Sequence, residues 1–218
     1  MSETIIAALI GAGITLITTI ITVFVNAHIE NDKRKREIRQ KDFETKRNNL
    51  TKVYKKLLSI INLYPNASPN DLLNNIEYPP EYSMESFDTI IDILKWQIDD
   101  YAQDLKNSEI ALTQKNKMKV EILNREYLIK QIAQIRDDYF NASGSYREFC
   151  KTDKMIFDLY AGQDVKNSLA DFEVAIHNTF TSGHSVGNIY DPTNNTIDRI
   201  RQEMINYMRN DLGIIDRS

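Results

Sequence analysis

The chain has 218 residues, a formal net charge of −4 and a single cysteine. A net negative charge argues against direct binding of duplex DNA, which depends on lysine and arginine contacts to phosphate. One cysteine excludes an intramolecular disulfide and suits a reducing cytosol.

The first predicted element is an uncharged, apolar stretch from Ile5 to Val25. As a helix, its 21 residues would be about 31 Å long, which is enough to cross the hydrocarbon core of a bilayer. A buried helix of a soluble protein is the alternative, but such helices rarely run this long without a charge. Residues 1–27 are therefore expected to form a transmembrane anchor.

Small and hydroxyl side chains recur within this stretch every three or four residues, so a helix would place them on one face. Such a stripe permits close contact and hydrogen bonds between membrane helices. In a larger ring it would face an aqueous lumen, where threonine hydroxyls tolerate water and ions. Both interpretations are open, as is a chance result of composition. The stripe consists of Ala8, Gly11, Thr15, Thr18 and Thr22.

Positive charge follows the apolar stretch and does not precede it: eight lysines and arginines lie between Lys33 and Arg47. Because such residues stay on the cytoplasmic side, we expect a single pass through the inner (plasma) membrane, with the N-terminus outside and the C-terminal part in the cytoplasm. A cleaved signal peptide is the rival interpretation, but its charges would come first. The cluster is also expected to bind anionic lipid head groups at the membrane surface. It consists of Lys33, Arg34, Lys35, Arg36 and Arg39.

Residues 28–63 are predicted to form one stalk helix that leaves the membrane. Its first half is almost wholly charged, and apolar residues recur with heptad-like spacing from Phe43 onward. This change is typical of a stalk that joins a helical bundle, and the heptad-like spacing is also that of a coiled coil. Residues 64–86 hold four of the five prolines and are predicted to be a loop with at most a short helix at 71–76.

Amphipathic periodicity predicts that the remaining chain is a series of helices. We expect a turn at 113–117, a bend at Ser143–Ser145 and a loop at 181–195. Ser86, Asp164 and either Asn195 or Thr193 are the candidate N-caps, and Gly213 ends the last helix. The expected helices span 86–112, 118–140, 146–161, 164–180 and 195–212.

Sustained alternation of apolar and polar residues, the mark of a half-buried strand, does not occur. The predicted fold class is therefore all-α. An N-terminal transmembrane helix continues into the stalk helix, and residues 64–218 form a cytosolic helical domain.

Signatures of known catalytic sites do not occur in the sequence, so we expect no enzyme, no cofactor and no metal site. His177 is interpreted as a bundle or surface residue, and His184 as part of a flexible surface turn. Cys150 is expected to fill the core. The pairs Asp99–Asp100 and Asp137–Asp138 are interpreted as solvated, because adjacent helical residues point about 100° apart.

The layout resembles that of small bacterial membrane proteins of antiphage defence operons. It consists of one N-terminal membrane span, a cluster of basic residues after it and a helical cytosolic domain. The closing residues Met208–Gly213 (MRNDLG) are similar to a tail of uncharacterised bacterial proteins with this layout. The class includes channel-forming effectors such as the membrane subunit of Hailong-type systems. The resemblance implies a cytosolic domain that senses a nucleotide signal made by a partner nucleotidyltransferase.

Two functional hypotheses follow. In the first, a homo-oligomer of single-span subunits is an ion-channel effector of antiphage defence, gated by a nucleotide or oligonucleotide signal or by an operon-encoded protein. In the second, the anchor is a passive tether whose helical domain recruits a protein partner. Both place the protein among membrane lipids, and neither requires an enzymatic step.

Overall fold

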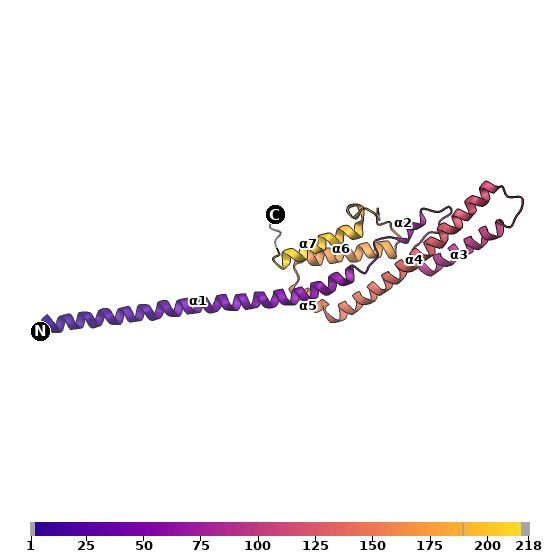
Figure 1. Cartoon of the computed structure of the whole chain (residues 1–218). Helices are drawn as coiled ribbons and strands as arrows, with labels where there is room; N and C mark the ends of the chain where they lie inside the picture. The colour runs from indigo at the N-terminus through magenta and orange to yellow at the C-terminus, as the bar shows by residue number, and fades with distance from the viewer. Residues whose placement is uncertain (1–2, 189, 215–218) are drawn as a thin grey trace. The chain divides into compact units, whose positions relative to one another are not determined.

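The computed structural model describes the backbone of residues 3–188 and 190–214, with the side chains of residues 19, 21–188 and 190–214. These residues are helical or in loops and contain no strand, which confirms the all-α class (Figure 1). The helices are α1 (Glu3–Ile61), α2 (Pro69–Leu73), α3 (Phe87–Asp104), α4 (Leu112–Thr152), α5 (Lys154–Tyr160), α6 (Gln163–Phe180) and α7 (Thr196–Asp211), and a 3-10 turn, η1, spans Pro192–Asn194.

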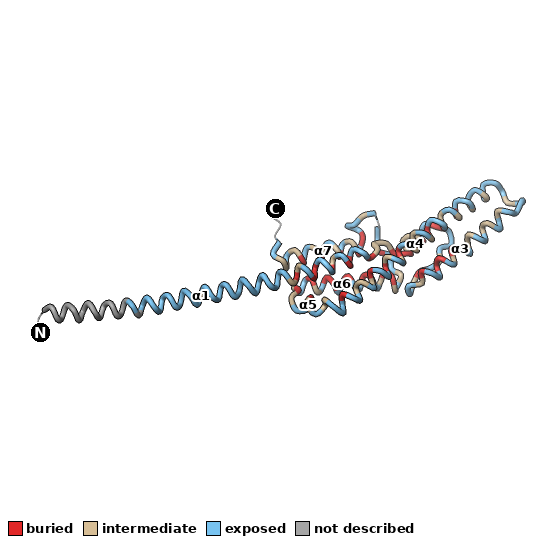
Figure 2. Tube along the Cα trace, turned by 60° about the horizontal axis from the view of Figure 1, so that its bottom comes forward, coloured by how far each residue is buried: buried red, intermediate tan, exposed pale blue. Residues whose placement is uncertain are grey.

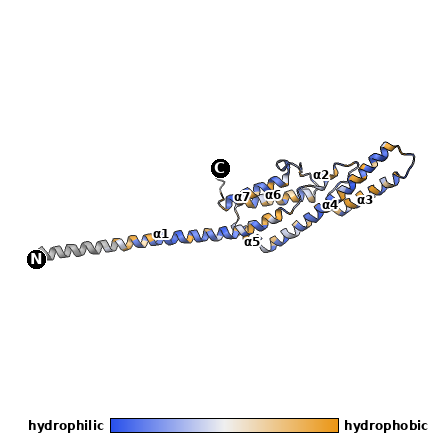
Figure 3. Cartoon of the chain, in the orientation of Figure 1, coloured by the Kyte–Doolittle hydropathy of each residue, from blue (hydrophilic) through white to orange (hydrophobic). Residues whose placement is uncertain are grey.

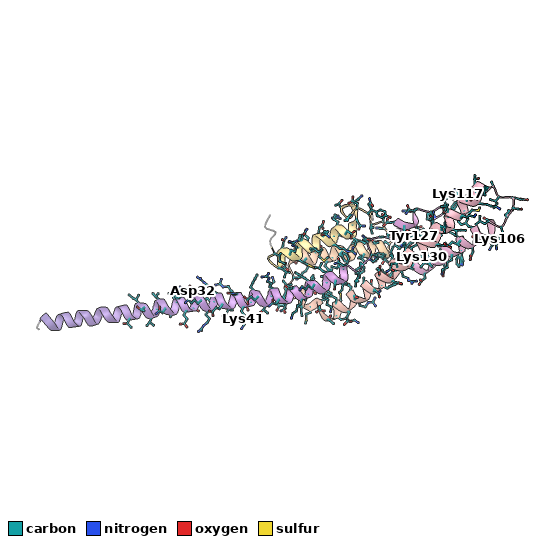
Figure 4. The ribbon with its side chains drawn as sticks, viewed as in Figure 1. Asp32, Lys41, Lys106, Lys117, Tyr127 and Lys130 are labelled. Atoms are coloured by element: carbon teal, nitrogen blue, oxygen red, sulfur yellow. The ribbon has the colours of Figure 1, made fainter. Side chains whose placement is uncertain are left out.

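The chain divides into two compact units, residues 1–48 and 49–218. The first unit is the N-terminal part of α1, where charged side chains such as those of Asp32 and Lys41 project from the helix (Figure 4). Among the described residues, none of the helices combines the length and apolar character that crossing a membrane requires. The expected anchor at Ile5–Val25 falls largely outside the residues whose side chains are described.

In the second unit, the last turns of α1 line the hydrophobic core. Leu50 and Leu57 are at most 1% exposed, and Tyr54 packs edge to face on Phe157 of α5 at 6.3 Å between ring centroids. Burial of a side chain such as that of Leu57 stabilises the fold by about 1.5–3 kcal/mol. The buried segments of this unit are red in Figure 2. The heptad-like pattern therefore marks the core from Leu50 onward, whereas Phe43 is exposed.

The C-terminal end of α1 is capped by an arginine of α7. Arg201 donates from Nε to the carbonyl oxygen of Ile61 at 3.2 Å, and a second guanidinium nitrogen donates to the carbonyl oxygen of Tyr64. Its third nitrogen donates to the Asp198 carboxylate at 2.7 Å. The last carbonyls of a helix lack partners within the helix and favour a positive charge. Burial nevertheless lowers the pKa of Arg201, and Asp198 opposes that shift.

Helices α3 and α4 pack against each other, as their amphipathic patterns predict (Figures 1 and 3). The predicted turn at 113–117 is wrong, because the chain turns at 105–111 and α4 already begins at Leu112. The predicted bend at Ser143–Ser145 is also wrong, because α4 continues to Thr152. Gly144 disfavours a helix by about 1 kcal/mol. Burial of Ala142 and Phe149 on the same helix offsets that penalty.

A buried arginine holds the proline-containing loop on α3 and α4. Arg125 of α4 is 0% exposed and lies over the ring of Tyr101 at 4.8 Å. It donates to the Gln97 side chain at 2.8 Å, to the Glu121 carboxylate at 2.5 Å and to the Glu77 carbonyl oxygen at 2.6 Å. Buried charges require such partners, so this residue is a structural one with its donors occupied.

Two other helix ends are fixed by carboxylate and amide side chains. Asn195, one of the two predicted candidates, is the N-cap of α7 and accepts from the backbone of that helix's first turn, whereas Thr193, the other candidate, lies in η1. The N-cap of α6 is Gly162, so the prediction of Asp164 is wrong by two residues. The Asp211 carboxylate explains this start, because it accepts from the Gly162 backbone N–H at 2.8 Å and from the Tyr54 hydroxyl.

The two long loops are joined by hydrogen bonds. The Asn70 side chain donates to the carbonyl oxygens of Tyr82 and Gly183, at 2.9 and 2.7 Å, and Asp71 accepts from the Val186 N–H at 3.1 Å. Gly183 has a φ of 73°, and a Cβ there would lie 2.2 Å from the Tyr82 carbonyl oxygen. The loop at 181–195, in which His184 was expected to belong to a flexible surface turn, is therefore tied to the loop that follows α1.

A tyrosine-lined pocket as the candidate functional site

A pocket of about 250 Å³ lies within the second unit, where residues from the segment just after α1, the loop before α3, α4 and α6 meet. Its floor is aromatic, and its rim carries two glutamates and a histidine. The lining residues are Tyr64, Glu85, Tyr139, Ser143, Tyr146, Phe172, Glu173, Ile176, His177 and Thr181.

Three buried rings from three segments form the floor. Tyr64 packs edge to face on Tyr139 and Phe172, with ring centroids 6.2 and 5.5 Å apart. Each ring is at most 7% exposed. Tyr64 is placed by the backbone hydrogen bond from its N–H to Ile61, at the last turn of α1. Tyr139 belongs to a run of buried residues with helical spacing on α4 that includes Ile135. The floor therefore depends on the helix packing that buries α1.

Two tyrosine hydroxyls hold the two rim glutamates. The Tyr139 hydroxyl donates to Glu85 Oε1 at 2.5 Å, and the Tyr146 hydroxyl donates to Glu173 Oε1. Burial raises the pKa of both tyrosines, and the adjacent carboxylates raise it further. Burial also raises the pKa of Tyr64. The three phenols are therefore neutral near pH 7. Tyr139 and Tyr146 donate to carboxylates, whereas the Tyr64 hydroxyl donates to Ser143 Oγ at 3.5 Å.

Glu85 is held over the pocket by a strained backbone. Met84 and Glu85 have φ values of 53° and 56°, in the left-handed region that side chains other than glycine rarely adopt. Their N–H groups donate to the carbonyl oxygens of Thr181 and Phe180, at 2.7 and 3.1 Å, and so satisfy the end of α6. Each such conformation disfavours the fold by about 1–3 kcal/mol and persists only where the surroundings impose it.

The rim and floor differ from each other in polarity. Glu85, Glu173 and His177 are exposed, whereas the rings beneath them are buried. In the described part of the chain, no lysine or arginine forms an ion pair with either glutamate, and none lines the pocket. The described residues also contain no group of histidine, cysteine and acidic side chains arranged to hold a metal. The arrangement can bind a ligand through charge and aromatic contact.

Of the residues singled out from the sequence, His177 lines the pocket, and the described members of the stripe and of the basic cluster do not. Of the small-residue stripe, Ala8, Gly11, Thr15 and Thr18 lie outside the residues whose side chains are described, and Thr22 is exposed on α1. The basic cluster, Lys33, Arg34, Lys35, Arg36 and Arg39, is exposed on the same helix.

Two predictions about single residues can be compared with the structure. His177 is exposed, as expected for a surface residue, and also lines the pocket. Cys150 is exposed, so the expectation that it fills the core is wrong. The helical face that carries Phe149 is the buried one, and the next residue points away from it.

Apolar periodicity predicts that Tyr139 faces the core, but the sequence did not single out the other pocket tyrosines or the two glutamates, Glu85 and Glu173. One signal was present: the chain has 11 tyrosines and a single tryptophan. A tyrosine at a buried helical position needs a partner for its hydroxyl. Several such positions on neighbouring helices therefore indicate a polar feature within the core.

A scan against protein-family models gave no match, and neither did searches of the curated proteins and of the solved structures. The chemistry of the pocket therefore rests on its own residues.

Proposed function

We propose that the protein is a homo-oligomeric, single-span protein of the inner membrane, in which a ligand bound in the tyrosine pocket controls an ion channel formed by the N-terminal helices. The observation that carries the proposal is the position of Tyr64. This residue forms part of the pocket floor and lies three positions after Ile61, the last residue of α1.

The membrane part of the proposal rests on the sequence. The 21 uncharged residues from Ile5 to Val25 have the length of a bilayer span, and the basic cluster that follows would retain the C-terminal part in the cytoplasm. The exposed lysines and arginines of α1 would lie at the surface of the lipid head groups.

The coupling part rests on contacts at the end of α1. Arg201 donates to the carbonyl oxygens of both Ile61 and Tyr64, so one side chain joins the helix end to a pocket residue. A ligand that binds more tightly to one position of Tyr64 than to another would shift the equilibrium at this helix end. Because α1 extends without interruption from Ile61 to Glu3, we propose that this shift reaches the N-terminal helices.

The channel part rests on the stripe of small and hydroxyl residues, and the role in antiphage defence rests on the resemblance in layout.

Thiol accessibility tests the lumen directly. Cysteines at Thr15, Thr18 and Thr22 should react with a small charged thiol reagent when the protein is active. Cysteines at Ile14 and Ile17 should stay unreactive, because hydrocarbon disfavours the charged thiolate.

Subunit number tests the assembly. Mass photometry of the detergent-solubilised protein should give four or more subunits, which a helix-lined lumen requires. A monomer would contradict both the channel and the helix contact. Equal reactivity of the cysteines on both faces of the helix would contradict the lumen.

The passive tether is the second candidate, favoured by an apolar stripe on α4. Val120, Leu123 and Tyr127 follow one another at helical spacing and are 55, 62 and 61% exposed; Tyr127 is labelled in Figure 4. Exposed apolar groups on one helix face are typical of a surface that docks another protein. If the protein is only a tether, replacing Leu123 with Glu should abolish recruitment of a partner, with no ion flux to lose.

A further inference from the structure

The tyrosine pocket has an unbalanced charge. Glu85 comes from the loop before α3 and Glu173 from α6, so two separate segments bring a carboxylate to one rim. Within the described residues neither has an ion-pair partner. His177 is the third titratable group of the rim, and the charge of Arg147 reaches Tyr64 without lining the pocket. The rim therefore lacks a cation that a ligand could supply.

The carboxylates are also held in place before any ligand arrives. Each accepts a hydrogen bond at Oε1 from a tyrosine hydroxyl, Tyr139 for Glu85 and Tyr146 for Glu173. Glu85 is further fixed by the backbone hydrogen bonds that hold its left-handed conformation. Groups fixed in their binding positions lose less conformational entropy when a ligand binds, which favours affinity.

The aromatic floor suits the same kind of ligand. The floor rings are at most 7% exposed, so little ring surface is open to a ligand, and the floor offers apolar contact to a small alkyl group. A pocket of about 250 Å³ is smaller than the sites of drug-sized ligands, which start at about 300 Å³. The ligand must therefore be small.

We propose that this pocket binds a small organic cation, an alkylammonium with a primary or quaternary nitrogen. The two glutamates balance the charge of the nitrogen, and the alkyl part of the ligand contacts the apolar lining of the pocket. A nucleotide, the signal implied by the layout, would instead bring phosphate beside two carboxylates. This inference rests on the proposed function only in treating the pocket as the sensing site.

Calorimetric titration of the full chain in detergent tests the proposal with four probes. Choline and butylammonium represent the cation, 3,3-dimethylbutan-1-ol is the neutral isostere of choline, and adenosine monophosphate represents a nucleotide. Saturable binding is expected for at least one of the two ammonium probes, with none for the alcohol or the nucleotide.

The variants Glu85→Gln and Glu173→Gln should each weaken that binding about tenfold, because a charge-assisted contact becomes a neutral one. Both substitutions keep the shape of the side chain and the acceptor for the tyrosine hydroxyl. Glu126→Gln is the matched control, since Glu126 is exposed on α4 outside the pocket. Its affinity should equal that of the unaltered protein, and circular dichroism should show that all three variants are folded.

Three results would overturn the proposal: no binding of either ammonium, equal binding of choline and its neutral isostere, or binding unaffected by both pocket variants. The proposed function is tested separately, by measuring ion flux. Ammonium binding without any effect on ion flux would contradict ligand gating and support the ligand assignment. Gating by the nucleotide alone would support a gated channel and contradict the assignment.

Discussion

Replacement of Arg201 with Ala tests how the end of α1 is held in the second unit. The substitution removes the hydrogen bonds to the carbonyl oxygens of Ile61 and Tyr64 and the ion pair with Asp198 at 2.7 Å. The side chains of the pair are 11 and 17% exposed, so Asp198 would lose a partner in a poorly solvated place. Loss of one member of a buried pair destabilises a protein by about 3–5 kcal/mol.

The assay is urea unfolding of the full chain in detergent, followed by circular dichroism, and the quantity compared is the midpoint. With a slope of about 1–3 kcal/mol per molar urea, a loss of about 3 kcal/mol lowers the midpoint by at least about 1 M. Arg199→Ala is the matched control on the same helix, because Arg199 forms an exposed pair with Glu203 at 3.1 Å. Exposed pairs of this spacing contribute about 0.3–0.5 kcal/mol. Equal midpoints for the two variants would refute the assigned role of Arg201.

Three further predictions follow from other contacts. Tyr54→Phe removes the hydroxyl that donates to Asp211 and should lower the unfolding free energy by about 1–3 kcal/mol; an unchanged urea midpoint would count against this contact. Hydrogen bonding by Lys56 lowers the pKa of Asp153 below 3.8, so its contribution is present above pH 3.8 and is lost as the pH falls through the folded-state value. The thermal midpoint should therefore fall more steeply below pH 4 in the unaltered protein than in Asp153→Asn, and parallel curves would contradict this. Gly11→Leu should reduce the subunit number measured by mass photometry, because a bulky side chain separates membrane helices that pack closely; an unchanged number would mean that Gly11 is not in a helix contact.

Local chemistry made parts of the fold predictable from the sequence. The Asn195 side chain accepts from one N–H of the first turn of α7, that of Asp198, so neighbouring residues alone limited the cap to Asn195 or Thr193. The proline-containing loop after α1 could be identified in the same way, because proline removes backbone donors. The periodicity of Leu50, Leu57 and Ile61 identified the face of α1 that packs in the core.

Other parts depended on contacts between distant residues. Ser143–Ser145 has the composition of a bend, and its helical conformation follows from burial of Ala142 and Phe149. Nothing near Gly162 indicates that α6 starts there, because the partner, Asp211, is 49 positions away. Such pairings are fixed only when the helices pack.

The pocket also depends on contacts between residues that are distant in the sequence. Tyr139 lies at an apolar position in the helical periodicity of α4, and it is buried in the core. Its hydroxyl, however, binds a glutamate 54 positions earlier in the chain. That glutamate, Glu85, reaches the pocket through backbone hydrogen bonds to the end of α6. The burial of a tyrosine in the core can therefore be predicted from the sequence, whereas the carboxylate that its hydroxyl contacts cannot.

Ion flux through proteoliposomes that contain the full chain tests the central claim most directly. Flux should appear when choline or butylammonium is added and should require higher concentrations in Glu173→Gln, because the ligand is held less tightly. Thr18→Leu should lower the maximal flux while the oligomer stays assembled, since a dry constriction hinders ions. Absence of flux from the assembled protein with every probe, on either side of the membrane, would contradict a gated channel.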